Sequence, residues 1–368
     1  LDGTVRLYSD GHTAIFTPEA GFTGAASFDF PADDGDSLSN TATLSVTVKN
    51  ASLVNITFSK RDLVLAAGAS ATLSFTGLFS DGSSAPLPAT FLHLATSDAS
   101  RFIVTSSGTI FALANGSAIL TATSNGVTAA SAVTVGPADA RTLQFFPLTC
   151  TLSLAETRQF QVRNATSSDV VDISSAAGGT FYFLSNSSVG TISADGLFTP
   201  TALGTTWVTV INGGQSVVVP ITVTAASIGA TTVGAAGGIV GDSSGDTLAI
   251  PAGSLASGST ITVTPLASLP YALPDGFDYY GGLHVDLGGA DLTQPASIAI
   301  KAPADLPVGA KIYLWVPITI TTDAAQGPVQ SWLLIDHMTV GADGYMRTTS
   351  APYGGFVGGF PNNGAAAV

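Results

Sequence analysis

The chain has 368 residues, a net charge of −14, and charged side chains at only 10 % of its positions. At roughly 100–150 residues per domain this length corresponds to about three domains, and short all-β modules raise the expectation to four. The 11 basic residues are scattered among 25 acidic ones, whereas a nucleic-acid surface requires clustered positive charge. We therefore expect no nucleic-acid partner, and the low charge content is unlike that of cytosolic enzymes, which carry about 25 % charged residues.

The single cysteine, Cys150, excludes an intramolecular disulfide. It lies in the alternating run 148–152, where we expect a small buried strand residue; a reactive or intermolecular thiol is the alternative. A large secreted chain without disulfides is more typical of bacteria than of animals. No run of about 18 apolar residues occurs, so no membrane-spanning segment is expected. Residue 1 is Leu and no signal peptide is visible, which favours a processed or partial polypeptide.

Alternation of apolar and polar residues predicts β-strands along the whole chain, for example at 42–48, 119–123 and 207–210. Turn dipeptides such as Asp81-Gly82 and Asn125-Gly126 separate these runs, because they tolerate the positive φ of tight hairpins. No window of a dozen residues has a clean helical period with caps. Many short strands at regular spacing predict β-sandwiches.

The ends of the alternating runs divide the chain into four units. They are residues 1–49, 50–136, 137–224 and 225–360, and residues 361–368 are expected to form a flexible tail. Units two and three repeat with a period of about 87 residues, so their folds should match.

The repeat carries a recognisable pattern in the blocks 107–118 and 194–205. Together with the Gly-containing strand 65–73 and the hairpin Gly77-Leu78-Phe79-Ser80-Asp81-Gly82-Ser83, it resembles bacterial group 2 immunoglobulin-like domains. Unit three departs from the pattern between Asn164 and Gly179. The resemblance implies immunoglobulin-like sandwiches, which in bacteria mostly serve as stalk modules of adhesins and surface proteins.

Residues 1–49 resemble the second half of a bacterial cadherin-like tandem domain. The motifs are Gly3-Thr4-Val5, Gly21-Phe22-Thr23-Gly24 and Ser27-Phe28-Asp29-Phe30. That family has further strands before this point, so the resemblance implies an incomplete sandwich with an open strand edge. Such an edge captures another strand or aggregates.

Unit four is similar to bacterial ZU5-like domains at Gly237-Gly238-Ile239-Val240, 248–255 and 260–266. Some relatives of that fold cleave themselves at a His followed by Phe-Ser or Leu-Ser. Here Leu283-His284-Val285-Asp286 places no hydroxyl after His284, so this activity is not expected. The predicted fold class is all-β: tandem immunoglobulin-like β-sandwiches followed by a C-terminal ZU5-like β domain.

The sequence offers little catalytic chemistry. The four histidines, His12, His93, His284 and His337, lie apart without metal-ligand spacing, and Glu occurs only at positions 19 and 156. We therefore predict no enzymatic activity and no required cofactor. The three tryptophans, Trp207, Trp315 and Trp332, fall within β-runs, where core packing is expected.

Calcium is the ligand with the best sequence support. Asp33, Asp34 and Asp36 place three carboxylates on one loop, and such oxygen-rich loops suit calcium. A plain polar hairpin is the alternative. The acidic turn from Asp242 to Asp246 is a weaker candidate.

These patterns predict a structural, non-catalytic subunit or stalk of a bacterial cell-surface or extracellular fibre. The open N-terminal unit suggests self-assembly by strand complementation, and the Gly-rich aromatic segment 353–360 is either a flexible terminus or a strand for another molecule's edge. The alternative is an adhesin that binds a glycan or protein through its C-terminal domain. A third reading is a set of accessory modules from a large secreted enzyme. The expected partners are further copies or other surface proteins.

Overall fold

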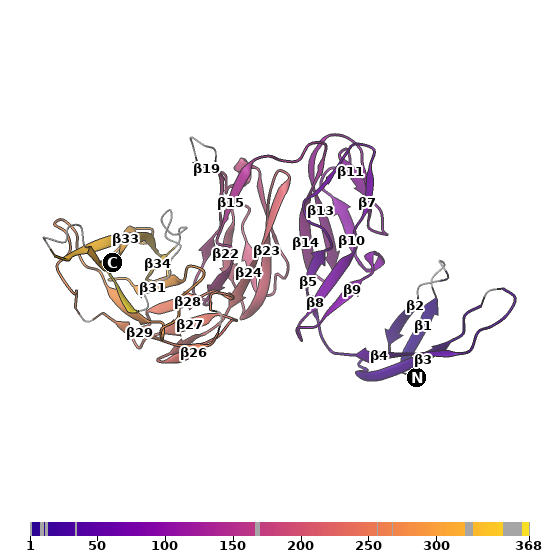
Figure 1. The fold of residues 1–368 in the computed structure, drawn as a ribbon, viewed down its shortest axis with the longest axis horizontal. Helices are drawn as coiled ribbons and strands as arrows, with labels where there is room; N and C mark the ends of the chain where they lie inside the picture. Colours follow the sequence, from indigo (N-terminus) through magenta and orange to yellow (C-terminus); the bar gives the residue numbers. More distant parts are fainter. Residues whose placement is uncertain are drawn as a thin grey trace. The chain divides into compact units, whose positions relative to one another are not determined.

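The computed structural model describes residues 2–7, 11, 14–33, 35–165, 170–255, 257–266, 268–320, 327–348 and 363–367. Its regular structure is almost entirely β-strand (Figure 1). Within the described residues the helical structure consists of two single-turn 3-10 helices, η1 (Ala89–Phe91) and η2 (Ala176–Gly178). The all-β prediction is confirmed. No helix among these residues has the length and apolar character needed to cross a membrane.

The N-terminal segment forms two hairpins and buries few apolar side chains. Strand β1 (Gly3–Leu7) pairs antiparallel with β2 (Ala14–Pro18), and β3 (Gly24–Phe30) pairs antiparallel with β4 (Ala42–Val48). Residues 1–53 and 79–83 make up one compact unit, and among their described residues Ala26 is the one fully buried hydrophobic residue.

Residues 53–135, here called the second module, form three small sheets. The first has the order β10 (His93–Thr96), β13 (Gly116–Ser124), β14 (Val127–Val135), β6 (Leu63–Leu65). The others have the orders β11 (Phe102–Val104), β12 (Thr109–Ala112), β7 (Ser70–Thr72) and β5 (Leu53–Phe58), β8 (Phe75–Phe79), β9 (Ser84–Leu87). Phe102, Ile110 and Leu120 are among the fully buried side chains of this module.

Residues 142–223, the third module, repeat this arrangement strand for strand. The corresponding orders are β20 (Thr180–Leu184), β23 (Gly204–Asn212), β24 (Gln215–Val223), β16 (Cys150–Leu152); then β21 (Gly190–Ile192), β22 (Leu197–Pro200), β17 (Arg158–Gln159); then β15 (Thr142–Phe146), β18 (Gln161–Ala165), β19 (Val170–Asp172). The fold match predicted for the repeat is confirmed. Cys150 is a buried strand residue, as predicted.

The second and third modules each contain one parallel strand pair at the same place in the fold. An early strand pairs in parallel with the last strand, β6 with β14 and β16 with β24. The remaining pairs in the two four-stranded sheets are antiparallel. The second strand and the last strand of each module are therefore joined directly by main-chain hydrogen bonds.

Residues 226–367, the C-terminal module, form one 11-stranded sheet around a single large core. The order is β25 (Ala226–Ile228), β27 (Gly238–Gly241), β28 (Thr247–Ile250), β31 (Ser297–Lys301), β34 (Tyr345–Thr348), β33 (Val329–Val340), β32 (Lys311–Ile320), β35 (Asn363–Ala367), β30 (Gly282–Asp286), β29 (Ser259–Pro265), β26 (Thr231–Val233). A β-bulge interrupts the β32–β33 register between Leu314 and Trp315.

Residues 363–367 of the C-terminal segment form strand β35, which pairs with β30 along its whole length and satisfies main-chain groups that would otherwise form an unpaired edge. One expectation from the sequence differs from this fold, because the tryptophans are half-buried rather than in the core. Trp207 and Trp315 each lie between two buried neighbours on their strand, so the period of two turns their side chains outward.

Candidate functional site at the module junctions

The residues predicted to bind calcium lie on a turn whose acceptors are partly used locally. Asp33 Oδ1 accepts a hydrogen bond of 2.8 Å from the Gly35 main chain, and Asp33 forms an isolated bridge with Leu38. Asp34 lies outside the described residues. Among the residues that the structure describes, no three His, Cys, Asp or Glu side chains come together in a way that could hold a metal ion. The calcium site remains a prediction.

The second acidic turn is a structural element. Asp242 Oδ1 accepts hydrogen bonds from the main chain of Ser244 (2.8 Å) and of Asp246 (3.0 Å). Asp246 Oδ1 accepts one of 2.8 Å from the Lys301 main chain on β31. Both aspartates are buried, and burial, assisted by the neighbouring Asp242 charge, raises the pKa of Asp246. These carboxylates hold the β27–β28 turn against the next strand.

The histidines do not form a site. His93 lies on β10, His284 on β30 and His337 on β33, and His12 lies outside the described residues. His337 instead lies against an aromatic neighbour, with 5.1 Å between its ring centroid and that of Tyr313.

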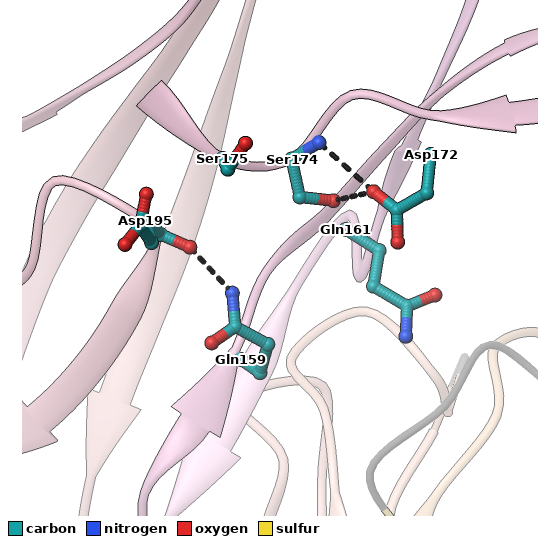
Figure 2. Close-up of a pocket in the computed structure, with 6 residues that line it drawn as sticks. All are labelled: Gln159, Gln161, Asp172, Ser174, Ser175 and Asp195. Carbon is teal, nitrogen blue, oxygen red and sulfur yellow. Dashed lines mark hydrogen bonds between the residues drawn. The ribbon is translucent and has the colours of Figure 1, made fainter. Parts of the chain in front are cut away.

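An open polar depression of about 430 Å³ lies on the third module (Figure 2). It is lined by Gln159, Gln161, Asp172, Ser174, Ser175 and Asp195. Several of these groups are used within the fold: Ser174 donates to Asp172 Oδ1 at 2.5 Å, and Gln159 donates to the Asp195 carbonyl at 2.6 Å. The lining offers hydrogen bonds to a polar ligand, but it includes no histidine, thiol or amine for acid–base or nucleophilic chemistry.

Several hydrogen-bonded networks among the described residues lie where consecutive modules meet. The main chains of the second and third modules are hydrogen-bonded to each other. The Thr128 N–H donates to the Ser185 carbonyl at 3.1 Å, and Val127 forms an isolated β-bridge with Asn186. An apolar cluster crosses the same junction and joins Ile119, Ala130 and Ala132 of the second module to Ile211 of the third.

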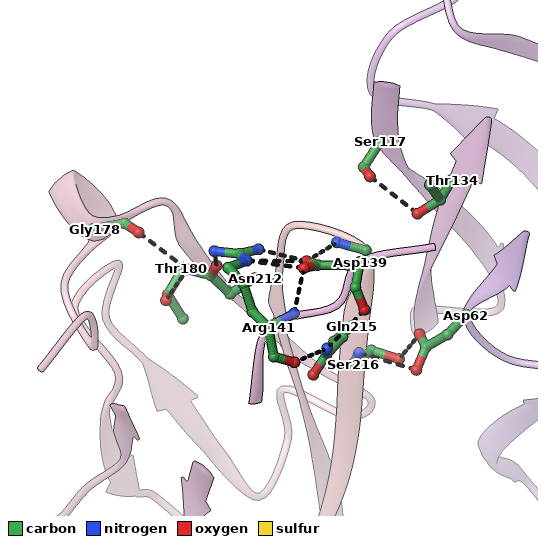
Figure 3. Close-up of polar contacts among 11 residues, drawn as sticks. Asp62, Ser117, Thr134, Asp139, Arg141, Gly178, Thr180, Asn212, Gln215 and Ser216 are labelled. Atoms are coloured by element: carbon green, nitrogen blue, oxygen red, sulfur yellow. Dashed lines mark hydrogen bonds and ion pairs between the residues drawn. The ribbon is translucent and has the colours of Figure 1, made fainter. Parts of the chain in front are cut away.

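Asp62 connects these two modules through both of its carboxylate oxygens (Figure 3). Oδ1 accepts a 2.5 Å hydrogen bond from the Ser216 hydroxyl, and Oδ2 accepts a 3.1 Å bond from the Ser216 main chain. Asp62 has a φ of 50°, a left-handed conformation that few non-glycine residues adopt. The modules are therefore joined by a short, charge-assisted contact that a non-acidic residue could not reproduce.

The segment between the modules contains an ion pair, and both of its partners are hydrogen-bonded to the third module. Arg141 donates to Asp139 at 2.6 Å and to Asn212 Oδ1 at 2.9 Å (Figure 3). The hydrogen bond from Arg141 lowers the pKa of Asp139 to about 2. Asn212, only 2 % exposed, donates in turn to Thr180 and to the Gly178 carbonyl. The connecting segment is thus held along its length rather than left free.

Glycine allows the closest approach at this junction. The β23–β24 hairpin turns through Gly213 and Gly214, and Gly214 lies directly against the second module. A Cβ atom at Gly214 would clash with the Thr134 hydroxyl and would lie 3.2 Å from Cβ of Asp139. The two modules can pack this tightly because position 214 has no side chain.

The junction between the third and C-terminal modules contains a buried ion pair. Arg347 on β34 donates to Glu156 at 3.3 Å and to both carboxylate oxygens of Asp343. Glu156 is 4 % exposed, and its other oxygen accepts a 2.6 Å bond from the Ser153 main chain. Nearby, Arg158 donates to the Thr348 carbonyl at 2.8 Å. Arg141, Arg158 and Arg347 thus place three of the chain's seven arginines at the two junctions.

Sequence reasoning did not find these residues. They contact one another across separations such as 154 positions for Asp62 and Ser216 and 191 for Glu156 and Arg347, and no local motif marks them. One signal was present. In a chain with only two glutamates, an isolated Glu156 two residues from Arg158 and flanked by apolar strands is a candidate for a paired, buried charge.

In the comparison with known proteins, one family model matches the N-terminal part of the chain. Residues 1–47 match the family model described as bacterial Ig domain, and no curated protein matches the sequence. Similar solved structures include domains 4 and 5 of the S-layer protein SbsC, at 17 % identity over 48 % of this chain and 100 % of that one, with a TM-score of 0.20. Human protocadherin-24 EC1-2 is 15 % identical over 47 % of this chain and 99 % of that one, with a TM-score of 0.17.

A longer structure of SbsC, rSbsC(31-844), matches at 15 % identity over 80 % of this chain, with a TM-score of 0.23. The chain spans 50 % of the length of that structure. The strands and sheets of the chain itself show a nearly all-β protein of immunoglobulin-like sandwich architecture.

The Asp139–Arg141 contact predicts a pH dependence. The folded-state pKa of Asp139, about 2, is below its ordinary value of 3.8, so the contact stabilises the fold fully above about pH 4 and its contribution is lost as the pH falls towards 2. The difference in unfolding free energy between the wild type and Asp139→Asn should shrink over this interval when measured by denaturant titration. A difference that does not change between pH 5 and 2 would contradict the assignment.

The Glu156–Arg347 pair predicts a strong effect from removing one partner. Glu156→Ala should lower the unfolding free energy by about 3 kcal/mol, near the lower end for breaking a buried pair because Arg347 keeps Asp343. It should also separate the unfolding of the third and C-terminal modules in calorimetry. Glu19→Ala, at the exposed glutamate, is the control and should leave the profile unchanged. Equal effects of the two variants would sink this reading.

Proposed function

We propose that this protein is a structural, non-catalytic stalk or subunit of a bacterial cell-surface or extracellular fibre. The observation that carries the proposal is where the chain uses its buried charges. In a sequence with 10 % charged residues, Glu156, Arg158 and Arg347 are largely buried between modules and Asp62 is paired across a junction. Such contacts fix the geometry between neighbours, which a stalk requires and an isolated catalytic domain does not.

The strand pairing within each module suits a chain under tension. Val133, Thr134 and Val135 at the end of the second module pair in parallel with Leu63, Val64 and Leu65 near its start, and β24 pairs with β16 in the same way. A pull on the two ends of a module loads these parallel hydrogen bonds together along the strands rather than one after another. The modules therefore resist extension at the pairing of their second and last strands.

The finer organisation is part of the same proposal. Residues 50–136 and 137–224 are group 2 immunoglobulin-like domains, residues 225–360 are a ZU5-like domain with a β extension, and residues 1–49 belong to a cadherin-like or immunoglobulin-like sandwich. The match of residues 1–47 to a bacterial Ig domain supports an immunoglobulin-like fold at the N-terminus and an extracellular bacterial setting.

Strand complementation at the N-terminal segment is the proposed route of self-assembly. Val5, Leu7, Phe30 and Leu44 of its hairpins are more than 40 % exposed, so the two sheets leave apolar surface for a further strand. A strand from a second copy would pair with these edges and cover this surface.

Self-assembly at this segment predicts oligomers whose fraction rises with protein concentration in sedimentation velocity. Val5→Lys places a charge on the exposed face of β1 and should shift the distribution towards the monomer by roughly tenfold in dissociation constant. Val64→Lys, at a similarly exposed valine of the second module, is the control. A wild-type monomer at all concentrations would contradict strand complementation.

An adhesin is the second candidate, and one surface favours it. Phe277 and Tyr313 on the C-terminal module are 43 % and 46 % exposed, and the Phe277 ring lies 5.3 Å from that of Trp315 and 6.3 Å from that of Tyr313. Clustered, partly exposed aromatic rings are typical of surfaces that recognise sugars or proteins.

The stalk proposal predicts a stiff junction between the second and third modules. Single-molecule fluorescence transfer between dyes at Ser106→Cys and Ala194→Cys, both exposed, should give one narrow distance distribution. Cys150 need not be replaced, because burial raises the pKa of its thiol to about 12 and keeps it unreactive. Gly214→Ala should broaden the distribution by forcing Thr134 away.

The double variant Gly214→Ala with Thr134→Ala is the matched control, since it removes the hydroxyl that the new methyl group meets; it should recover a narrow distribution. A broad distribution in the wild type would overturn the stalk proposal.

A further inference from the structure

The last described strand occupies an interior position in the C-terminal sheet. Strand β35 lies between β30 and β32, and its antiparallel register with β30 runs from Asp286↔Asn363 to Gly282↔Ala367. It meets β32 at Trp315↔Ala367. In the described part of the sheet, β30 and β32 are connected through β35, so without it both strands would present an unpaired edge.

The residues of β35 are Asn363-Gly364-Ala365-Ala366-Ala367, none with a large apolar side chain. The described contribution of this strand to the sheet is its main-chain pairing with β30 and β32. The apolar walls come from its neighbours: Leu283 and Val285 on β30 are 0 % exposed, and Leu314 on β32 is 1 % exposed. A strand held in this way is defined by its backbone, so the same segment from another molecule fits equally well.

We propose that β35 exchanges between molecules, so that β35 of one chain fills the β30–β32 slot of a second copy. The hydrogen bonds are identical in cis and in trans, so the balance depends on the connection to β34. The connecting residues 349–362 number 14, four of them glycine, and span at most about 46–50 Å when extended. That is long enough to reach an adjacent molecule.

Concentration decides which arrangement dominates. A connection of this length gives a cis effective concentration on the order of millimolar, so exchange in trans competes when the local density of chains is similar. A fibre or a crowded cell surface supplies that density, whereas dilute solution does not. This inference rests on the proposed role in a surface assembly, but it concerns a different strand from the N-terminal segment and can be tested separately.

The first measurement checks the register in one chain. His284 and Ala365 are opposite each other in the β30–β35 ladder, so His284→Cys with Ala365→Cys should form an intramolecular disulfide on mild oxidation at about 10 μM protein. Cys150 stays in place because it is buried and its thiol pKa is about 12. Failure of this disulfide to form would overturn the proposal, because β35 would not then lie in the slot.

The second measurement detects exchange. His284→Cys protein and Ala365→Cys protein, carrying different affinity tags, are mixed at about 1 mM and oxidised. Exchange predicts a disulfide-linked heterodimer whose yield falls more than about tenfold on dilution to about 10 μM. His284→Cys mixed with Ser106→Cys measures random collision and should give at least about tenfold less product at 1 mM. Heterodimer no more abundant than in this control would overturn the proposal.

The two proposals can fail independently. The heterodimer reports strand exchange at β35 whether or not the N-terminal segment assembles, and the Val5→Lys sedimentation result does not involve the C-terminal sheet. If the junctions prove flexible but the heterodimer forms, the exchange stands and the stalk proposal falls.

Discussion

The parallel pairing of an early strand with the last strand of a module is the interaction on which the arrangement of the two repeats depends. It adds the second strand of each module to the edge of a four-stranded sheet, beside the last strand of that module. Because β14 ends beside β6, the loop that carries Asp62 lies within reach of the next module. The same pairing that completes each fold therefore positions the residues that join one module to the next.

The chain has few charged residues, and several of them lie at the junctions between modules. A surface of Ser, Thr and small apolar residues needs few ions for solubility, and the chain concentrates its most buried ion pair between modules. A buried pair such as Glu156–Arg347 costs desolvation and adds little net stability, but it penalises every arrangement in which the partners are separated. Such a pair contributes specificity of geometry rather than strength.

The junctions and the slot filled by β35 make the same use of small residues. Gly214 permits two modules to touch, and the segment 363–367 of small residues pairs with β30 through its main chain. In both places the main chains of two segments approach closely. Contacts of this kind are easily repeated between identical copies, which is what the proposed self-assembly requires.

Alternation along the chain was enough to predict the β class, the repeat and the buried position of Cys150, because strand periodicity and turn residues are local properties. The same period shows why the tryptophans were misplaced: Trp207 and Trp315 are on strands, but the sequence does not say which face of each strand is covered. Burial depends on what packs against a strand, and that is decided far along the chain.

The C-terminal segment shows a second limit of prediction from the sequence. Asn363-Gly364-Ala365-Ala366-Ala367 has no alternation and no bulky residue, so its composition predicts flexibility, yet the edges of β30 and β32 give it a place in the sheet. The pairings of Asp62 with Ser216 and of Glu156 with Arg347 are likewise not detectable in the sequence, because the partners lie far apart along the chain. The sequence by itself determined that the alternating segments are strands; only the tertiary structure decided which edges meet and that 363–367 joins them, because pairing depends on distance in space.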